Sequence, residues 1–77
     1  MPTLEEFTNI VKLYFRDGWK NLTSEQVDEY IYGEEAQELI INRYNEEVKA
    51  YKNGDITEQQ FWVGATSSVA NCLIYMY

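Results

Sequence analysis

The chain of 77 residues contains no histidine, one cysteine, one proline and only six basic residues. Without histidine it lacks the commonest general base of enzymes and the commonest transition-metal ligand. Its one cysteine, Cys72, excludes a disulfide within the chain, and because it lies in an apolar stretch we expect it to be a small core residue. Four scattered glycines build neither a P-loop nor a dinucleotide-binding loop. We therefore expect no catalytic residue, no cofactor and no metal ion.

Basic residues are few beside the acidic ones, with 6 Lys and Arg against 13 Asp and Glu and a net charge of −7. Direct binding to nucleic acid needs basic side chains that displace counterions from phosphates, so this charge argues against a nucleic-acid ligand. The first residues show no basic segment followed by an apolar run, which favours a cytoplasmic protein over a secreted one.

Charge of either sign is absent from Gln59 to Tyr77. A membrane span needs about 20 predominantly apolar residues. This segment is interrupted by glutamine, threonine, serine and asparagine, and no Lys or Arg flanks it. We therefore expect a buried helix and no contact with a membrane.

The pattern T-x-x-E/Q occurs three times, beginning at Thr3, Thr23 and Thr57, and each time an apolar residue follows it. This pattern is the capping box, in which the threonine and the Glu or Gln bond each other's backbone N–H at a helix start. The apolar content of 45% is enough for one folded domain in a chain of this length. The three boxes therefore predict three helix starts in a single domain, residues 1–77.

The spacing of the apolar residues predicts an all-α fold, a compact bundle of four helices. Their expected ranges are about 3–17, 23–32, 34–53 and 57–76. Gly18 is expected to end the first helix by taking positive φ. The apolar stripes before and after Gly33 are out of phase, which predicts that the short second helix is broken from the third at this residue. A single bent helix is the alternative.

The last predicted helix is apolar on most sides, and we expect it to be the central helix that the others wrap. Its main apolar stripe consists of Phe61, Ala65, Val69, Cys72, Leu73 and Met76. A strip of small polar residues, where another backbone could approach closely, consists of Gly64, Ser67, Ser68 and Asn71.

Between residues 25 and 38 the sequence has six carboxylates and no basic residue. The six are Glu25, Asp28, Glu29, Glu34, Glu35 and Glu38. Neighbours at i, i+3 and i+4 of a helix lie about 5–6 Å apart, so each helix would present its members together. Such a surface can attract a basic protein, and a small acidic inhibitor can mimic the charge of nucleic acid in this way. Acidity that serves only solubility is the commoner origin of such a block.

Two aromatic residues, Trp19 and Tyr32, lie outside the apolar stripes. Tyrosine and tryptophan are enriched at protein interfaces, so both are candidates for partner contact. The alternative is that they cover the ends of a small bundle. Self-association is also compatible with a domain of this size, because it adds buried area.

The function that these features favour is a non-enzymatic interaction module or small inhibitor, which presents an acidic helical surface to a basic protein such as a nucleic-acid-binding protein. One alternative is a Mg²⁺ or Mn²⁺ enzyme that uses the E-E-x-x-E pattern of Glu34, Glu35 and Glu38. Another is a small structural homo-oligomer. A DNA-binding helix–turn–helix is disfavoured because its second helix would begin with two glutamates facing phosphates.

Overall fold

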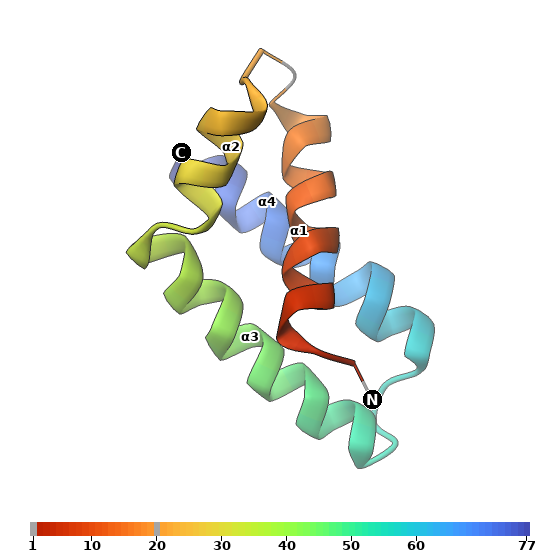
Figure 1. Ribbon diagram of the computed structural model, residues 1–77. Coiled ribbons are helices and arrows are strands. Elements are labelled where there is room, and N and C mark those ends of the chain that lie inside the picture. The colour runs from red at the N-terminus through yellow and green to blue at the C-terminus, as the bar shows by residue number, and fades with distance from the viewer. Residues whose placement is uncertain (1, 20) are drawn as a thin grey trace.

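In the computed structural model, which describes residues 2–19 and 21–77, these residues form four helices and no strand (Figure 1). The elements are α1 (Leu4–Gly18), α2 (Ser24–Ile31), α3 (Glu34–Lys52), the π-helical segment η1 (Gln60–Ala65) and α4 (Thr66–Met76). A short α-helical start at residues 58–59 leads directly into η1, so that 58–76 is one continuous helix. The prediction of an all-α bundle of four helices is confirmed, with each boundary within two residues.

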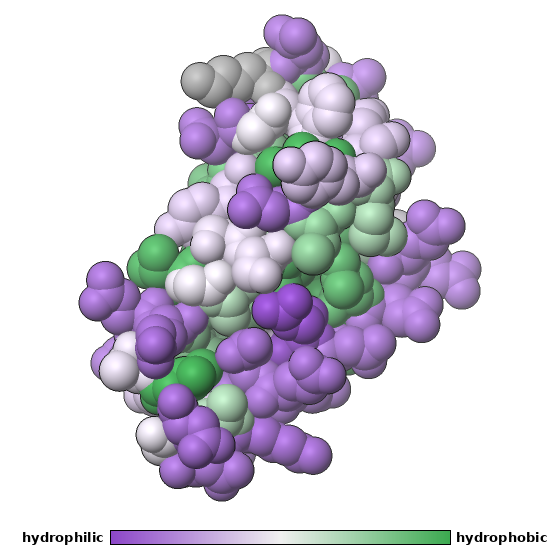
Figure 2. Space-filling model, turned by 180° about the vertical axis from the view of Figure 1, so that it is seen from behind, coloured by the Kyte–Doolittle hydropathy of each residue, from purple (hydrophilic) through white to green (hydrophobic). Residues whose placement is uncertain are grey.

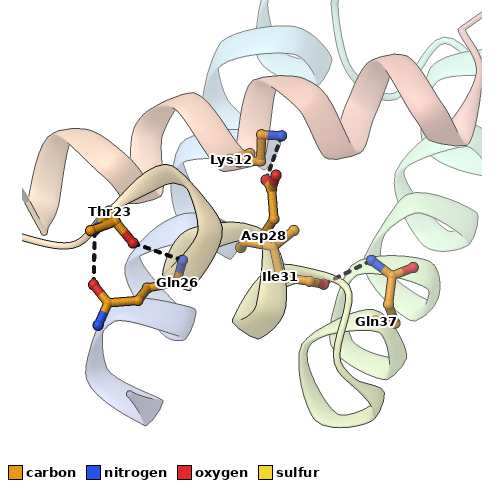
Figure 3. Close-up of polar contacts among 6 residues, drawn as sticks. All are labelled: Lys12, Thr23, Gln26, Asp28, Ile31 and Gln37. Atoms are coloured by element: carbon orange, nitrogen blue, oxygen red, sulfur yellow. Dashed lines mark hydrogen bonds and ion pairs between the residues drawn. The ribbon is translucent and has the colours of Figure 1, made fainter.

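All three predicted capping boxes are present. The hydroxyl of Thr3 accepts the backbone N–H of Glu6 at 3.1 Å, and the Glu6 carboxylate accepts the backbone N–H of Thr3 at 3.2 Å. Thr23 makes the same pair of bonds with Gln26, and Thr57 makes it with Gln60 (Figure 3 shows the Thr23 box). Each box supplies partners to backbone N–H groups that a helix start leaves without them.

The predicted break at Gly33 is also confirmed. Gly33 has extended backbone angles, φ −71° and ψ 164°, and it caps the start of α3. The side-chain amide of Gln37 donates to the carbonyl oxygen of Ile31 at 2.9 Å and so closes the end of α2 (Figure 3). Because the chain turns here, the buried residues of both helices meet in one core. They are Val27, Ile31, Ala36 and Ile40.

Gly18 does not end α1 by positive φ, as we expected. It is the last residue of the helix, and in the described part of the chain the residue with positive φ is Gly54, at 79°, in the turn after α3. The reason for glycine at position 18 is space, because a Cβ there would overlap the Cδ1 atom of Ile74. The absence of a side chain lets the end of α1 approach α4.

The core lies where α1 crosses α4, with α2 and α3 packed beside this pair (Figure 1). Aromatic rings fill the end of the core near the start of the last helix, where Phe61 lies against Phe7, Tyr51 and Trp62 at centroid distances of 5.5, 5.8 and 4.9 Å. The buried apolar residues are Phe7, Val11, Phe15, Val27, Ile31, Ala36, Ile40, Phe61, Ala65, Val69, Ala70 and Leu73. All four helices therefore contribute to one core.

The last helix departs from the expected regular α-helix at η1. The hydroxyl of Thr66 donates to the carbonyl oxygen of Trp62, and it lies 3.3 Å from that of Val63. A hydroxyl bonded back to the preceding turn competes with the backbone N–H for those carbonyls, and such bonds accompany π turns and bends. As a result Thr66 faces the core and is fully buried.

Two residues of the predicted stripe do not lie in the core, because the helix beyond the π turn points Ala70 inward instead. Cys72 is exposed, and Met76 is half exposed. The helix is also not enclosed by the others, since Asn71 and Tyr75 point to solvent. The described residues include no helix whose length and apolar character would let it cross a bilayer.

Candidate functional site

Three of the six acidic residues lie together on the outward side of α2. Glu25, Asp28 and Glu29 are exposed, while Val27 and Ile31 on the opposite side are buried. Positions 25, 28 and 29 are separated by three and four residues, so one helix face carries all three. Their common orientation follows from the apolar side of α2 being packed on the core.

Asp28 differs from the other members of this block because it has a basic partner. Its carboxylate lies 2.7 Å from Nζ of Lys12 on α1, and the same ammonium lies 5.5 Å from the ring centroid of Tyr32 (Figure 3 shows the ion pair). Within residues 2–19 and 21–77, the carboxylates of the other five members are in no ion pair. The charge of Asp28 is thus compensated locally, and the remaining charge of the block belongs to the glutamates.

The other three members are exposed at the start of α3. Two of them, Glu35 and Glu38, line a shallow groove together with Leu39, Asn42 and Met76. This groove lies between α3 and the end of α4. The acidic residues of α3 therefore border apolar surface, and they are not a purely solvated face.

A second shallow groove lies on the other side of the α4 end. It is lined by Gln26, Glu29, Tyr30 and Tyr77. Met76 and Tyr77 are 51% and 52% exposed. The structure therefore brings Glu29 of α2 and the glutamates of α3 to the two sides of one exposed apolar pair, and we call these five residues (Glu29, Glu35, Glu38, Met76 and Tyr77) the acidic end surface.

The two aromatic candidates lie apart from each other. Tyr32 is half exposed beneath Lys12, whereas Trp19 is half buried with its ring 5.4 Å from that of Tyr77. The indole N–H of Trp19 is buried and has no acceptor among the described residues. The Trp19 ring packs against Tyr77, which is a member of the acidic end surface. Tyr32 belongs to the outward side of α2.

Sequence reasoning missed Met76 and Tyr77 as surface residues, because it assigned Met76 to the apolar stripe of the last helix and did not single out Tyr77. Their exposure depends on where the helix stops relative to its neighbours, and on the π turn that sets which residues point inward. The absence of charge from residue 59 onward was the available signal, but it indicates burial and an apolar interface equally well.

Tyr30 connects the two sides of this surface. Its hydroxyl donates to the carbonyl oxygen of Leu73 at 3.1 Å, and its ring stacks on Phe15 at 5.2 Å and meets Tyr77 edge-on at 4.9 Å. Burial raises the pKa of Tyr30 above its usual value of 10.0, and the negative charges of Glu35 and of ionised Tyr77 raise it further. The neutral hydroxyl is thus the form that the folded protein favours.

We expect this shift to make stability fall as the solution becomes strongly alkaline. Because the pKa of Tyr30 is higher in the folded state than in the unfolded state, stability is retained below pH 10 and is lost as pH rises through the folded value. Tyr30→Phe should lower the free energy of unfolding by about 1 kcal/mol at pH 7, through the lost hydrogen bond. The difference from wild type should shrink above pH 10, as measured by urea unfolding at several pH values. A difference that grows with pH would contradict the assignment.

No group of three or more His, Cys, Asp or Glu side chains placed to hold a metal ion occurs in the part of the chain that the structure describes. Glu34, Glu35 and Glu38, the residues of the metal-enzyme alternative, therefore do not form such a group. The chemistry that the acidic end surface offers is charge attraction combined with apolar contact.

Comparisons of the chain with protein-family models, with curated proteins and with solved structures found no match.

Proposed function

We propose that this protein is a non-enzymatic interaction module that binds a basic protein surface through its acidic end surface. The observation that carries the proposal is the placement of Glu29, Glu35 and Glu38 around the exposed Met76 and Tyr77. These residues come from α2, α3 and the end of α4, so only the folded chain brings them together.

The combination fits the general anatomy of protein interfaces. An interface centre is typically apolar, is enriched in tyrosine and methionine and is surrounded by a polar rim. Here Met76 and Tyr77 supply the centre and the three glutamates supply the rim. The partner that matches is a segment with aliphatic side chains at its centre and Lys or Arg at its margins.

The charge of the whole chain supports the same partner. A net charge of −7 on 77 residues produces a field that speeds the encounter with a basic protein and repels nucleic acid. A protein that uses its basic groove to bind nucleic acid would lose access to that groove while this module occupied it. The proposal thus includes an inhibitor that competes by charge.

A defined peptide tests the surface. The probe is a fluorescent helical peptide of about 20 residues, with leucines along one stripe and lysines beside it. We expect the wild-type protein to bind it with an affinity that falls as salt increases. Glu38→Lys should weaken binding by about tenfold, because it removes an attractive contact and adds a repulsive one. Fluorescence anisotropy titrations at low and high salt measure both effects.

The matched control is Glu46→Lys, a position that is also exposed on the same helix but lies outside the acidic end surface. Both variants change the net charge from −7 to −5, because each replaces a negative charge with a positive one. Equal weakening by the two variants would mean that only the overall charge matters, and it would contradict the proposal that the peptide binds at the acidic end surface. Circular dichroism of both variants verifies that each remains folded.

A further inference from the structure

The outward side of the last helix is a second exposed surface, which the acidic end surface does not include. It carries the exposed Val63, Gly64, Asn71 and Tyr75, and Ser68 lies at its edge. Tyr75 is 92% exposed, the highest value among the exposed large hydrophobic residues. Figure 2 looks onto the side of the molecule where α4 lies, and pale and green residues occupy much of the middle of this side, with a few purple residues among them.

The last helix carries no charged side chain from residue 59 onward, because all 13 acidic and all 6 basic residues precede that position. A charged group does border the surface: the guanidinium group of Arg43 on α3 donates to the Ser68 hydroxyl at 3.4 Å, and it lies 3.6 Å from the Glu47 carboxylate, which compensates its charge. Two copies of a protein with a net charge of −7 repel each other over most of their surfaces. On the outward side of the last helix two copies can meet without placing unpaired like charges together, because the helix itself is uncharged and the neighbouring Arg43 is paired with Glu47. An exposed tyrosine in an uncharged surface is also typical of an interface centre.

We propose that two copies of this chain form a twofold dimer through this side of the last helix, with the two helices antiparallel. In a twofold contact, the same surface of both copies must fit itself. The midpoint of Gly64 and Tyr75 lies between Val69 and Ala70, and this is also the midpoint of Ser68 and Asn71.

A twofold axis at this midpoint places the largest exposed side chain against the smallest residue. Tyr75 of one copy lies over Gly64 of the other, and Ser68 lies near Asn71 of the other, within reach of a hydrogen bond. Gly64 has room for the ring, because nothing in the described chain lies within 4 Å of where its Cβ would be. The single helix face corresponds to a small interface and hence to a weak, reversible dimer.

Sedimentation equilibrium of the full chain tests the dimer, at protein concentrations from about 10 µM to about 1 mM. We expect the weight-average mass to rise above the 9.1 kDa of the monomer with concentration. Added salt should strengthen the dimer because it screens the repulsion between the copies, whereas it should weaken binding of the basic peptide. Dimerisation and peptide binding thus respond to salt in opposite directions, and the absence of one would not contradict the other. A monomer at every concentration would overturn the dimer.

Two variants test the register. Tyr75→Glu should raise the dissociation constant by at least about tenfold, while Leu13→Glu, on the exposed side of α1, should change it little although both give a net charge of −8. Gly64→Leu should raise the melting temperature, since glycine weakens a helix, and yet weaken the dimer by filling the space for Tyr75. A dimer that persists in both Tyr75→Glu and Gly64→Leu would show that the two copies do not meet through this side of the last helix. Loss of the dimer in Tyr75→Glu but not in Gly64→Leu would contradict the pairing of Tyr75 with Gly64 of the other copy.

Discussion

Phe61→Ala is expected to lower the free energy of unfolding by about 3–5 kcal/mol, the usual effect of removing a buried phenylalanine. The ring is fully buried at the start of the last helix and contacts rings from α1 and α3 as well as its neighbour Trp62. Its loss leaves a cavity that rigid aromatic neighbours close poorly. A domain of this size is stabilised by roughly 4–12 kcal/mol in total, so the loss would remove at least about a quarter of the stability.

Urea unfolding followed by circular dichroism measures this effect. Phe61→Leu should lie between wild type and Phe61→Ala, because it keeps part of the buried volume. Leu13→Ala, at a position 64% exposed, serves as the surface control and should change stability by less than about 0.5 kcal/mol. A loss below about 1 kcal/mol in Phe61→Ala would show that this ring is not the centre of the aromatic core.

Gly18→Val should be the second most damaging of these changes, lowering stability by about 1–3 kcal/mol, the range for overpacking. The Cβ of any residue at position 18 meets Cδ1 of Ile74, and valine adds two methyl groups at the same place. Gly18→Ala should be milder, since the end of the Ile74 side chain can rotate away and alanine favours the helix.

The test of this explanation is a double-mutant cycle with Ile74→Ala. If the clash with Ile74 is the cause, the double variant should be more stable than the sum of the two single losses predicts, by about 1 kcal/mol or more. Strict additivity would mean that glycine is needed at position 18 for another reason. Thermal unfolding of the four proteins in one buffer provides the comparison.

Local features of the fold were predictable from the sequence, because neighbouring residues decide them. The capping boxes at Thr3, Thr23 and Thr57 need only residues three apart, and all three are formed. The break at Gly33 followed from a phase change within α2 and α3. These features fixed the number and the limits of the helices.

Features that depend on distant contacts were not predictable. The role of Gly18 is set by Ile74, which lies 56 positions later in the chain. The pairing of Asp28 with Lys12 requires the packing of α2 on α1, and sequence spacing alone gave every member of the acidic block equal weight. Periodicity placed Cys72 in the core because it assumes a uniform α-helix, which the π turn interrupts.

The candidate surface was predicted in part. The glutamates were identified as exposed carboxylates, and the structure places Glu25, Glu29, Glu34, Glu35 and Glu38 in solvent. Sequence spacing did not show that Met76 and Tyr77 would lie among three of them, since that depends on the crossing of α4 over the other helices.

The π turn at η1 bears on how the sequence can tolerate the loss of a residue during evolution. A π turn holds about one residue more than an α-turn covering the same rotation. A version of the chain that lost one residue between Phe61 and Thr66 could therefore wind this stretch as ordinary α-helix and still direct the flanking segments into the same interior. Insertions and deletions in helices usually rotate everything downstream out of place, whereas a deletion within η1 is expected to keep the residues of α4 facing the core.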